Sequence, residues 1–450
     1  MLIYNIFFNL FFIILVFKGV CEDNFKFKPI KIVVLYKPSS KGNILDYKFN
    51  TALGKAIIWI QNLLNVRIMQ NSSIVTKKDF YNCMEEKNIS LNSIIGMLYK
   101  TEVTTIKKPI KFIKSINLSD LNANFGIILG INEGRCSSKS LEFAFAKVCN
   151  SGNLKSHDRP IIGKLVICKN SPSWDRINVP EDVFKHEIMH SLGFGIYIDN
   201  KRKQQIYDEI PWKMGKSYST TQKLKRYFMD FDSRAVKYAQ KHFNCSNIRR
   251  IESDDENQFH LNEYIFGNEL MTPISSNSRN ILTEMSATIL EDTYIGNISW
   301  YKFDMKKVQK ESKNYWYGHD WGCDFVEKSC YEYILNNIKK PFPFCSENDY
   351  IISYWKNGFT EVCYEKRNMV KKKMLLKCNI QGHVEEPGIK MSMLETPIIN
   401  FYPKLQQYGF NSYAFGSTKL YRYCPMIKEI TDNDNFFSRI DKEGFKIVKC

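Results

Sequence analysis

The chain has 450 residues, of which 44% are hydrophobic and 25% are charged, and its formal net charge is +17. The length predicts two or three domains, because a single core stops growing near about 250–300 residues. The composition excludes general disorder, and 22 Gly and 14 Pro are too few for a collagen-like or low-complexity chain. No internal repeat of fixed period is present.

Residues 1–21 are typical of a secretory signal peptide. The run Ile6–Phe17 is apolar except for Asn9, and it is shorter than the about 20 residues of a membrane-spanning helix. Gly19 and Cys21 are small residues suited to a cleavage site before residue 22. No basic residue precedes the apolar run, so a short signal anchor is the alternative. Removal of Cys21 leaves an even number of the 13 cysteines, as in secreted proteins with disulfides.

Other features agree with a secreted, extracellular protein. After the N-terminus no apolar run approaches the about 20 residues of a transmembrane helix, and the C-terminus has no apolar tail for a lipid anchor. Sequons of the form N-x-S predict a glycosylated surface; they lie at Asn71, Asn88, Asn117, Asn244 and Asn297.

The positive charge is spread along the chain, with short clusters at Lys201–Lys203 and Lys371–Lys373. The simple interpretation is a solvated face. The functional interpretation is peripheral binding to anionic surfaces such as sulfated glycans or acidic lipid headgroups. Neither cluster has the length or the interleaved aromatic residues typical of nucleic-acid binding, so we expect no nucleic-acid partner.

The segment Pro180–Phe194, PEDVFKHEIMHSLGF, concentrates the chemistry. Its early proline and acids and the later Gly193 predict a helix with defined ends. His186 and His190 are spaced i, i+4, which places both imidazoles on one face, where they can bind one metal ion. Glu187 can hold a water beside the metal and accept its proton. This H-E-x-x-H pattern is a zinc protease signature, and the alternative is a surface helix with two solvated histidines.

A catalytic zinc needs a third protein ligand. The compact motif H-E-x-x-H-x-x-G-x-x-H fails here, because its last position is Ile196. The remaining candidates are His157, His242, His260, His319 and His383. His260 stands eleven residues before Met271, which lies in a polar turn ending at Pro273. A methionine beneath the zinc ligands is the Met-turn of metzincins, whereas the alternative is a core methionine in an ordinary loop.

Together these motifs resemble the leishmanolysins, also called invadolysins. In that family the third histidine follows an insertion after the helix glycine, as His260 does here. Four further segments are similar to the family: 158–168 (DRPIIGKLVIC), 242–245 (HFNC), 283–292 (TEMSATILED) and 315–325 (YWYGHDWGCDF). The resemblance extends from about Phe25 to about Cys345.

The resemblance implies roles for individual residues. It implies that His186, His190 and His260 bind one Zn2+ per chain, that Glu187 is the catalytic general base and that Met271 forms the Met-turn. His242 falls at a family position that is not a ligand, and it is the second candidate for the third ligand.

The chain also departs from the family. Family members usually carry a propeptide whose cysteine can cap the zinc, whereas Phe25–Val33 already resembles the start of the mature domain, so we expect no cysteine switch. Cys83 instead resembles a structural cysteine of the mature fold, paired with Cys149. The segment Asp292–Trp300 is longer than the family's link and contains a sequon, so we expect a different cleft shape.

We expect an α+β fold, with a metzincin-like catalytic lobe of a twisted sheet and an active-site helix. A Met-turn central region and a small disulfide-rich C-terminal domain follow. The expected boundaries are 1–21 for the signal peptide, 22–259 for the catalytic lobe with its insertion, 260–340 for the central region and 341–450 for the C-terminal domain. Apolar periodicity predicts helices at Ala52–Val66 and Thr220–His242 and strands at Phe125–Ile131 and Gly163–Ile167.

The sequence thus predicts a secreted zinc metalloendopeptidase that hydrolyses peptide bonds through a zinc-activated water, with Glu187 as general base. Its expected partners are protein or peptide substrates, and the resemblance suggests extracellular matrix or host proteins. One alternative is a catalytically weak adhesion or decoy module that retains the fold. Another is a structural extracellular protein with an accidental motif.

Overall fold

The computed structural model describes most of the first 344 residues and short pieces beyond them. The described residues are 26–37, 45–68, 74–84, 93–111, 114–134, 136, 142–149, 159–177, 179–195, 207–215, 221–231, 233–275, 279–292, 299–338, 341–344, 360–366, 371–378, 421–422, 424–429 and 445–447. Several predicted features lie outside them: the signal peptide 1–21, Asn71, Asn88, His157, Ile196, Lys201–Lys203, Asn297 and His383. The described residues form both helices and sheets, so the α+β prediction is confirmed at that level.

The first half of the chain is built on a six-stranded mixed sheet of order β6-β5-β2-β8-β10-β9. Its strands are β2 (Ile32–Tyr36), β5 (Ser93–Tyr99), β6 (Thr105–Lys111), β8 (Phe125–Ile131), β9 (Ala144–Cys149) and β10 (Ile162–Ile167). Strands β2, β8 and β10 run parallel, and the edge strand β9 is antiparallel to β10. The strands predicted at 125–131 and 163–167 are confirmed as β8 and as part of β10.

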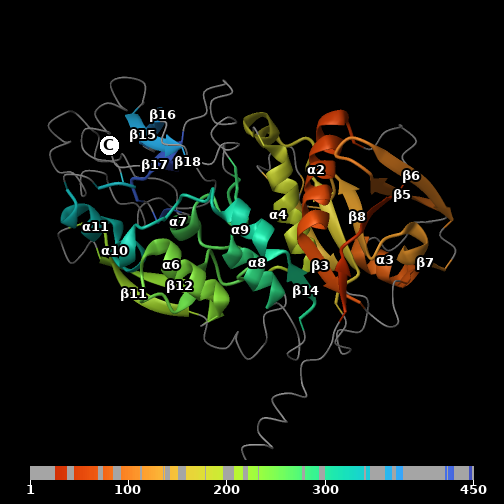
Figure 1. Ribbon diagram of the computed structural model, residues 1–450, viewed down its shortest axis with the longest axis horizontal. Helices are drawn as coiled ribbons and strands as arrows, with labels where there is room; N and C mark the ends of the chain where they lie inside the picture. Colours follow the sequence, from red (N-terminus) through yellow and green to blue (C-terminus); the bar gives the residue numbers. More distant parts are fainter. Residues whose placement is uncertain are drawn as a thin grey trace, which may run out of the picture.

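Successive residues of β2 pack on opposite faces of this sheet. Ile32 and Val34 belong to the larger core, which contains helices α2 (Tyr47–Leu63) and α4 (Pro180–Leu192). Val33 and Leu35 belong to a smaller core with helix α3 (Lys77–Met84). Because helices cover both faces, the central strands β2 and β8 contain no charged residue. Figure 1 shows α2 against the sheet and α4 between the sheet and the second half of the chain.

Helix α2 begins at Asp46, whose carboxylate accepts a hydrogen bond from the backbone N–H of Phe49. The helix predicted at Ala52–Val66 is therefore confirmed over residues 52–63, but it begins earlier, at Tyr47. It also ends earlier, because Leu64–Arg67 forms strand β3. This strand pairs with β1 (Phe27–Pro29) on one side and β14 (Tyr301–Phe303) on the other, which joins the two halves of the chain.

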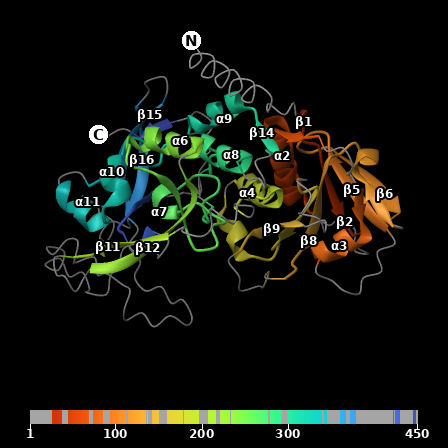
Figure 2. The same cartoon turned by 90° about the horizontal axis from the view of Figure 1, so that it is seen from below.

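The second half carries an antiparallel sheet of order β11-β12-β13 and a group of helices (Figure 2). The elements are β11 (Tyr207–Lys213), β12 (Thr221–Phe231), α6 (Arg234–Phe243), β13 (Arg250–Ser253), α7 (Glu263–Phe266), α8 (Glu284–Glu291), α9 (Met305–Ser312), α10 (Gly322–Glu327) and α11 (Cys330–Asn336). Smaller elements of the chain are β4 (Ile74–Thr76), β7 (Ser115–Asn117), η1 (Leu118–Leu121), η2 (Pro172–Arg176), β15 (Thr360–Lys366), β16 (Lys371–Cys378), β17 (Ile427–Glu429) and β18 (Phe445–Ile447). None of the helices in the described ranges is long and apolar enough to cross a membrane.

The helix predicted at Thr220–His242 is wrong in its first half. Residues 221–231 form strand β12, and only Arg234–Phe243 is helical, after the N-cap Ser233. Lysine and aromatic residues occur in both kinds of element. Residues 221–231 form a strand because they pair with β11 on one edge and with β13 on the other.

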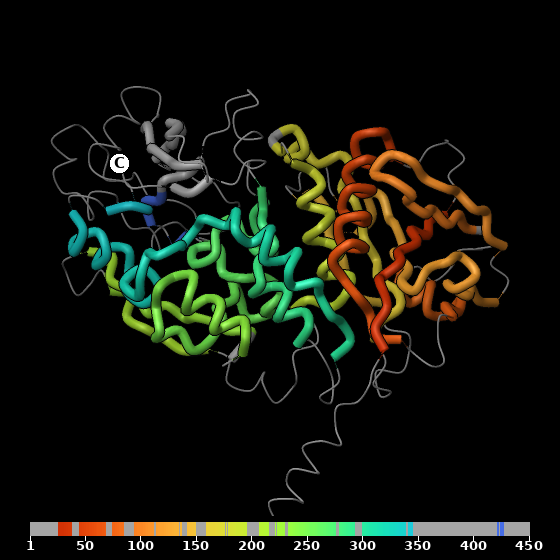
Figure 3. Tube along the Cα trace, in the orientation of Figure 1, coloured from red at the N-terminus to blue at the C-terminus, as the bar shows by residue number. Residues whose placement is uncertain are grey.

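Four disulfides join described cysteines. They are Cys83–Cys149, Cys136–Cys168, Cys245–Cys323 and Cys330–Cys424. The first confirms the pairing that the family resemblance implied. The last joins helix α11 to a segment close to the C-terminus, and Figure 3 shows that segment against the helices of the second half.

Candidate metal centre

Helix α4 carries the H-E-x-x-H motif between the two halves of the molecule. Its first residue is Pro180, its first turn contains Glu181 and Asp182, and it ends at Gly193. Gly193 has a φ of 112° and donates its backbone N–H to the carbonyl of His190. The positive φ explains why glycine is suited to the helix end. The predicted helix boundaries are therefore confirmed.

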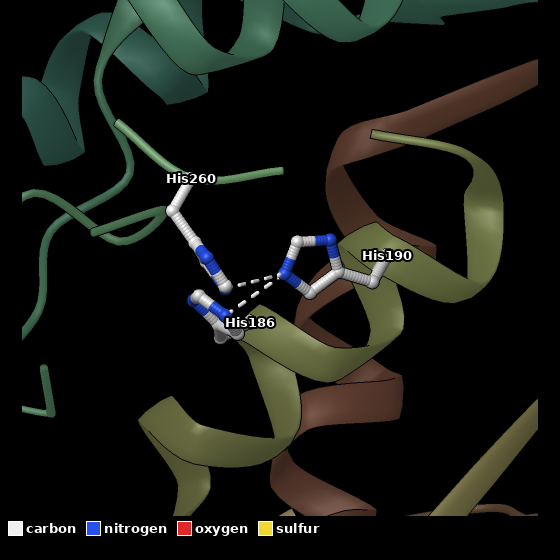
Figure 4. A group of neighbouring side chains, drawn as sticks. All are labelled: His186, His190 and His260. Atoms are coloured by element: carbon white, nitrogen blue, oxygen red, sulfur yellow. Dashed lines mark hydrogen bonds between the residues drawn. The ribbon is translucent and has the colours of Figure 1, made fainter. Parts of the chain in front are cut away.

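Three histidines from two separate segments converge beside this helix (Figure 4). The Nε2 atoms of His186 and His190 lie 3.0 Å apart, and the Nε2 atoms of His190 and His260 lie 3.2 Å apart. One ligand atom from each of the three lies within 4.8 Å of the others. This is the spacing expected of nitrogen atoms that share one metal ion.

The outer nitrogens of the two helical histidines face backbone carbonyls. His186 Nδ1 lies 2.7 Å from the carbonyl oxygen of Leu270, and His190 Nδ1 lies 3.3 Å from that of Phe194. A carbonyl only accepts, so the proton of each neutral ring is on Nδ1 and the lone pair is on Nε2. Two lone pairs then face each other across 3.0 Å, an arrangement that a cation between them would stabilise.

The third histidine is oriented by an acid. His260 Nδ1 lies 3.6 Å from Asp254 Oδ2, and the His260 side chain is 28% exposed. An acid behind a metal-binding histidine helps to fix the orientation of the ring. Asp254 therefore has the position of a supporting residue for the site, and nothing in the sequence distinguished it from the other acids of the run ESDDE at 252–256.

Burial keeps the helical histidines uncharged. It lowers the pKa of His186 to about 3, and the nearby His260 lowers it further, against the opposing effect of the Leu270 carbonyl. Burial also lowers the pKa of His190 well below its ordinary value, and the other two rings add to this effect. Neutral imidazole is the form that binds a metal ion.

Glu187 is buried beside the cluster, with 7% of its surface exposed. Burial and the neighbouring Glu142 raise its pKa to about 8, while a hydrogen bond from the backbone N–H of Ala146 opposes the rise. Ala146 lies in the edge strand β9, so this strand runs next to Glu187. A carboxyl group with a pKa near neutrality is suited to proton transfer.

The loop that contains Met271 contacts both metal-binding segments through its backbone. The carbonyl of Leu270 faces His186, and the carbonyl of Met271 accepts a hydrogen bond of 2.9 Å from the N–H of Leu261, next to His260. Met271 itself is fully buried. This loop thus fixes the α4 histidines relative to the third one.

Sequence reasoning missed Glu269, which organises that loop. Its fully buried carboxylate accepts hydrogen bonds from the N–H of Met271 at 2.6 Å and from the N–H and hydroxyl of Thr283 at 3.1 and 2.8 Å. Burial raises its pKa to about 7, against the effect of these donors. Its sequence signal was weak, an acid directly before Leu270 and Met271 in the turn GNELM.

Gly195 was also missed. Its φ is +77°, and a β-carbon there would meet Gln258 O and Phe259 Cα, each at 2.8 Å. The chain leaving α4 therefore passes in direct contact with the loop that presents His260, and only glycine fits there without displacement.

The other described histidines lie elsewhere. His242 is buried in α6, where its Nε2 lies 2.7 Å from the carbonyl of Tyr317 and its ring stacks on Tyr238 and Tyr315. His319 is near His242 and pairs with Asp320. In the part of the chain that the structure describes, neither joins the group of His186, His190 and His260.

Comparison with known proteins gives a consistent result. The profile of the leishmanolysin peptidase family matches residues 122–436, which include all three histidines. The chain is 25% identical over 350 residues to a leishmanolysin-like peptidase of Drosophila pseudoobscura pseudoobscura, covering 69% of this chain and 47% of the relative. Corresponding proteins of Caenorhabditis elegans and Caenorhabditis briggsae are 23% and 22% identical over 65% and 93% of this chain, and 46% and 69% of their own lengths. The chain spans about half the length of the fruit-fly and C. elegans relatives.

Proposed function

Because the chain belongs to the leishmanolysin family of metallopeptidases, we propose that it is a zinc-dependent endopeptidase that hydrolyses peptide bonds of protein substrates. The convergence of three imidazole Nε2 atoms beside a buried glutamate carries this proposal. In this assignment His186, His190 and His260 are the zinc ligands.

The donor set fits zinc rather than a harder cation. Three neutral imidazoles are a ligand set that zinc takes in catalytic sites, whereas calcium and magnesium prefer oxygen ligands. Among the described residues, no carboxylate oxygen belongs to the group that His186, His190 and His260 form. The carbonyl and carboxylate partners of the outer nitrogens hold the three rings toward a common point.

Glu187 is the general base in the proposed mechanism. A bound zinc ion would supply a Lewis acid that lowers the pKa of a water from about 16 toward about 7 and polarises a peptide carbonyl. Glu187, whose ionised form the charge of the bound ion would favour, accepts the proton of the attacking water. Glu187 next passes this proton to the leaving amine, so no covalent intermediate with the protein is needed.

Met271 is proposed as the Met-turn residue of a metzincin-type site. Its burial, and the contact of its carbonyl with the residue after His260, support this role. The proposed organisation is a catalytic lobe at 22–259, a central region at 260–340 and a C-terminal region at 341–450. The link between α11 and Cys424 ties the last two together covalently.

Secretion and glycosylation are part of the proposal. Four disulfides among the described residues are typical of an oxidising compartment. The sequon residue Asn244 lies exposed at the C-terminal end of α6, where an attached glycan has room. Extracellular matrix or host proteins are the proposed substrate class, by analogy with the family.

The test uses full-length protein produced through a secretory route. Cleavage of denatured casein is followed with and without a zinc chelator, beside a Glu187→Gln control. Chelator-sensitive cleavage that is absent from the control supports the proposal. One bound zinc per chain without any cleavage favours the adhesion or decoy alternative, and absence of stoichiometric zinc contradicts both.

A further inference from the structure

Two consecutive residues near the C-terminus are buried in the second half of the molecule. Arg422 forms an ion pair with Glu252, and the two side chains are 5% and 6% exposed. Its neighbour Tyr421 donates its hydroxyl to Glu263 Oε1 at 2.7 Å. These contacts span 170 and 158 positions of the sequence.

The two acids flank the loop that presents His260. Glu252 lies in strand β13, which ends directly before the loop 254–262. Glu263 is the first residue of helix α7, which begins directly after this loop. The loop is closed on itself, because Asn262 N–H donates to the carbonyl of Glu252 at 2.9 Å and Asp254 N–H donates to that of His260 at 3.2 Å. A movement of either acid therefore moves His260.

Arg422 is held in a specific and strained conformation. Its φ is 54°, a left-handed value that is unfavourable for a residue with a β-carbon. Its guanidinium lies 4.9 Å from the ring centre of Trp212 in β11 and 4.7 Å from that of Tyr264 in α7. Strained residues persist where their surroundings fix them, and here an ion pair and two cation–π contacts do so.

The segment around Arg422 is anchored on its other side. Cys424 forms the disulfide with Cys330 of helix α11, and Met426 bridges to Phe344. Tyr421 and Arg422 are thus fixed to α11 independently of the loop 254–262, and they can transmit that rigidity to it.

We propose that Tyr421 and Arg422 are positioning residues that hold the two ends of loop 254–262, so that His260 meets the histidines of α4. The C-terminal region then belongs to the metal centre through its support of the third ligand. The proposal rests on the proposed function, because it requires that His260 binds the metal.

The test measures the affinity of the full-length protein for Zn2+ alone, by competition with a chelating dye, together with the urea unfolding midpoint. Arg422→Met is expected to weaken zinc binding about tenfold, the lower range for loss of a supporting residue around a metal site. Tyr421→Phe removes one hydroxyl and is expected to have a smaller effect. Arg159→Met is the matched control, because Arg159 is similarly buried, with 5% of the residue exposed against 7% for Arg422, but bonds to three carbonyls in the other half of the molecule.

A double variant separates positioning from general stability. If Arg422 acts through His260, then Arg422→Met/His260→Ala binds zinc no more weakly than His260→Ala alone. Equal zinc affinity of the wild type and His260→Ala would contradict the proposed ligand set itself. Weaker binding by His260→Ala, with unchanged binding by Arg422→Met and Tyr421→Phe, would overturn only the positioning role. Should Arg422→Met fail to fold, Arg422→Lys and Tyr421→Phe decide the same comparison.

Discussion

The Nε2 atoms of His190 and His260 lie 3.2 Å apart, although 70 positions separate the two residues in the sequence. Helix α4 presents the first of them, and a loop between β13 and α7 presents the second. Two structural relationships produce this approach: the passage of Gly195 against the loop and the hydrogen bond between Leu261 and Met271.

Substitution of His260 distinguishes it from the alternative third ligand. His260→Ala is expected to lose stoichiometric zinc, because two imidazoles alone do not complete a catalytic site. His242→Ala is expected to keep zinc and to lower the free energy of unfolding by about 1–3 kcal/mol, because the carbonyl of Tyr317 loses a buried partner. Metal analysis after dialysis and urea unfolding measure the two effects. The reverse pattern would assign the third ligand to His242.

Glu187→Gln tests the general base. The amide preserves the size of the side chain but cannot accept the proton of a water. Turnover of a protein substrate is expected to fall by at least about 10²–10⁴-fold, while bound zinc remains near one per chain. Initial rates and metal content are measured on the same preparation. Near-normal cleavage by the zinc-loaded variant is incompatible with this role of Glu187.

Glu269→Gln tests how the buried carboxylate holds the Met271 loop. Both carboxylate oxygens accept hydrogen bonds, from Met271 and from Thr283. At pH 5, below its pKa of about 7, the Glu269 carboxyl group carries one hydrogen, whereas an amide carries two on the same nitrogen. The amide turns this NH2 group toward one of the donors and leaves a buried N–H unpaired. The free energy of unfolding at pH 5 is expected to fall by about 1–3 kcal/mol, as measured in urea. Glu311→Gln, on the half-buried contact with Trp59, is a control that leaves this loop intact.

The same substitution predicts a pH dependence. Burial raises the pKa of Glu269 from 4.5 to about 7. Between these values the folded state binds more protons than the unfolded state, so the contribution of Glu269 to stability is complete below about 4.5 and declines as the pH rises to about 7. The stability advantage of the wild type over Glu269→Gln should therefore shrink between pH 5 and pH 7.5. An advantage that is constant over this range would show that Glu269 keeps one protonation state.

Gly195→Ala tests the contact between the end of α4 and the loop of His260. Gly195 and Gly322 both have positive φ values, +77° and +80°, but a β-carbon at Gly322 meets nothing within 4 Å. Gly322→Ala is expected to cost about 1–2 kcal/mol of stability through backbone strain alone. Gly195→Ala is expected to cost about 1–3 kcal/mol more through steric overlap, and also to weaken zinc binding. Equal effects of the two variants on stability and on zinc would contradict the proposed contact.

Local sequence patterns predicted several elements well. The ends of α4 follow from Pro180 and Gly193, because each restricts the backbone at its own position. Two strands of the central sheet, β8 and most of β10, follow from apolar runs, since a strand covered on both faces is mainly apolar, and Lys164 in β10 is the exception. The strand β12 did not follow, because lysine and aromatic residues suit a helix as well as a strand and the pairing partners lie elsewhere in the chain.

The sequence by itself determined the chemistry of helix α4. The i, i+4 spacing places His186 and His190 on one face through local geometry alone, with Glu187 adjacent. The family resemblance pointed to His260 and Met271, but a linear pattern contains no distances between them. The tertiary structure decided which third histidine meets the helix. It also placed Glu269 against the Met271 loop and Arg422 against Glu252, beside the loop of His260. These roles depend on burial and on tertiary contacts, which a linear pattern does not contain.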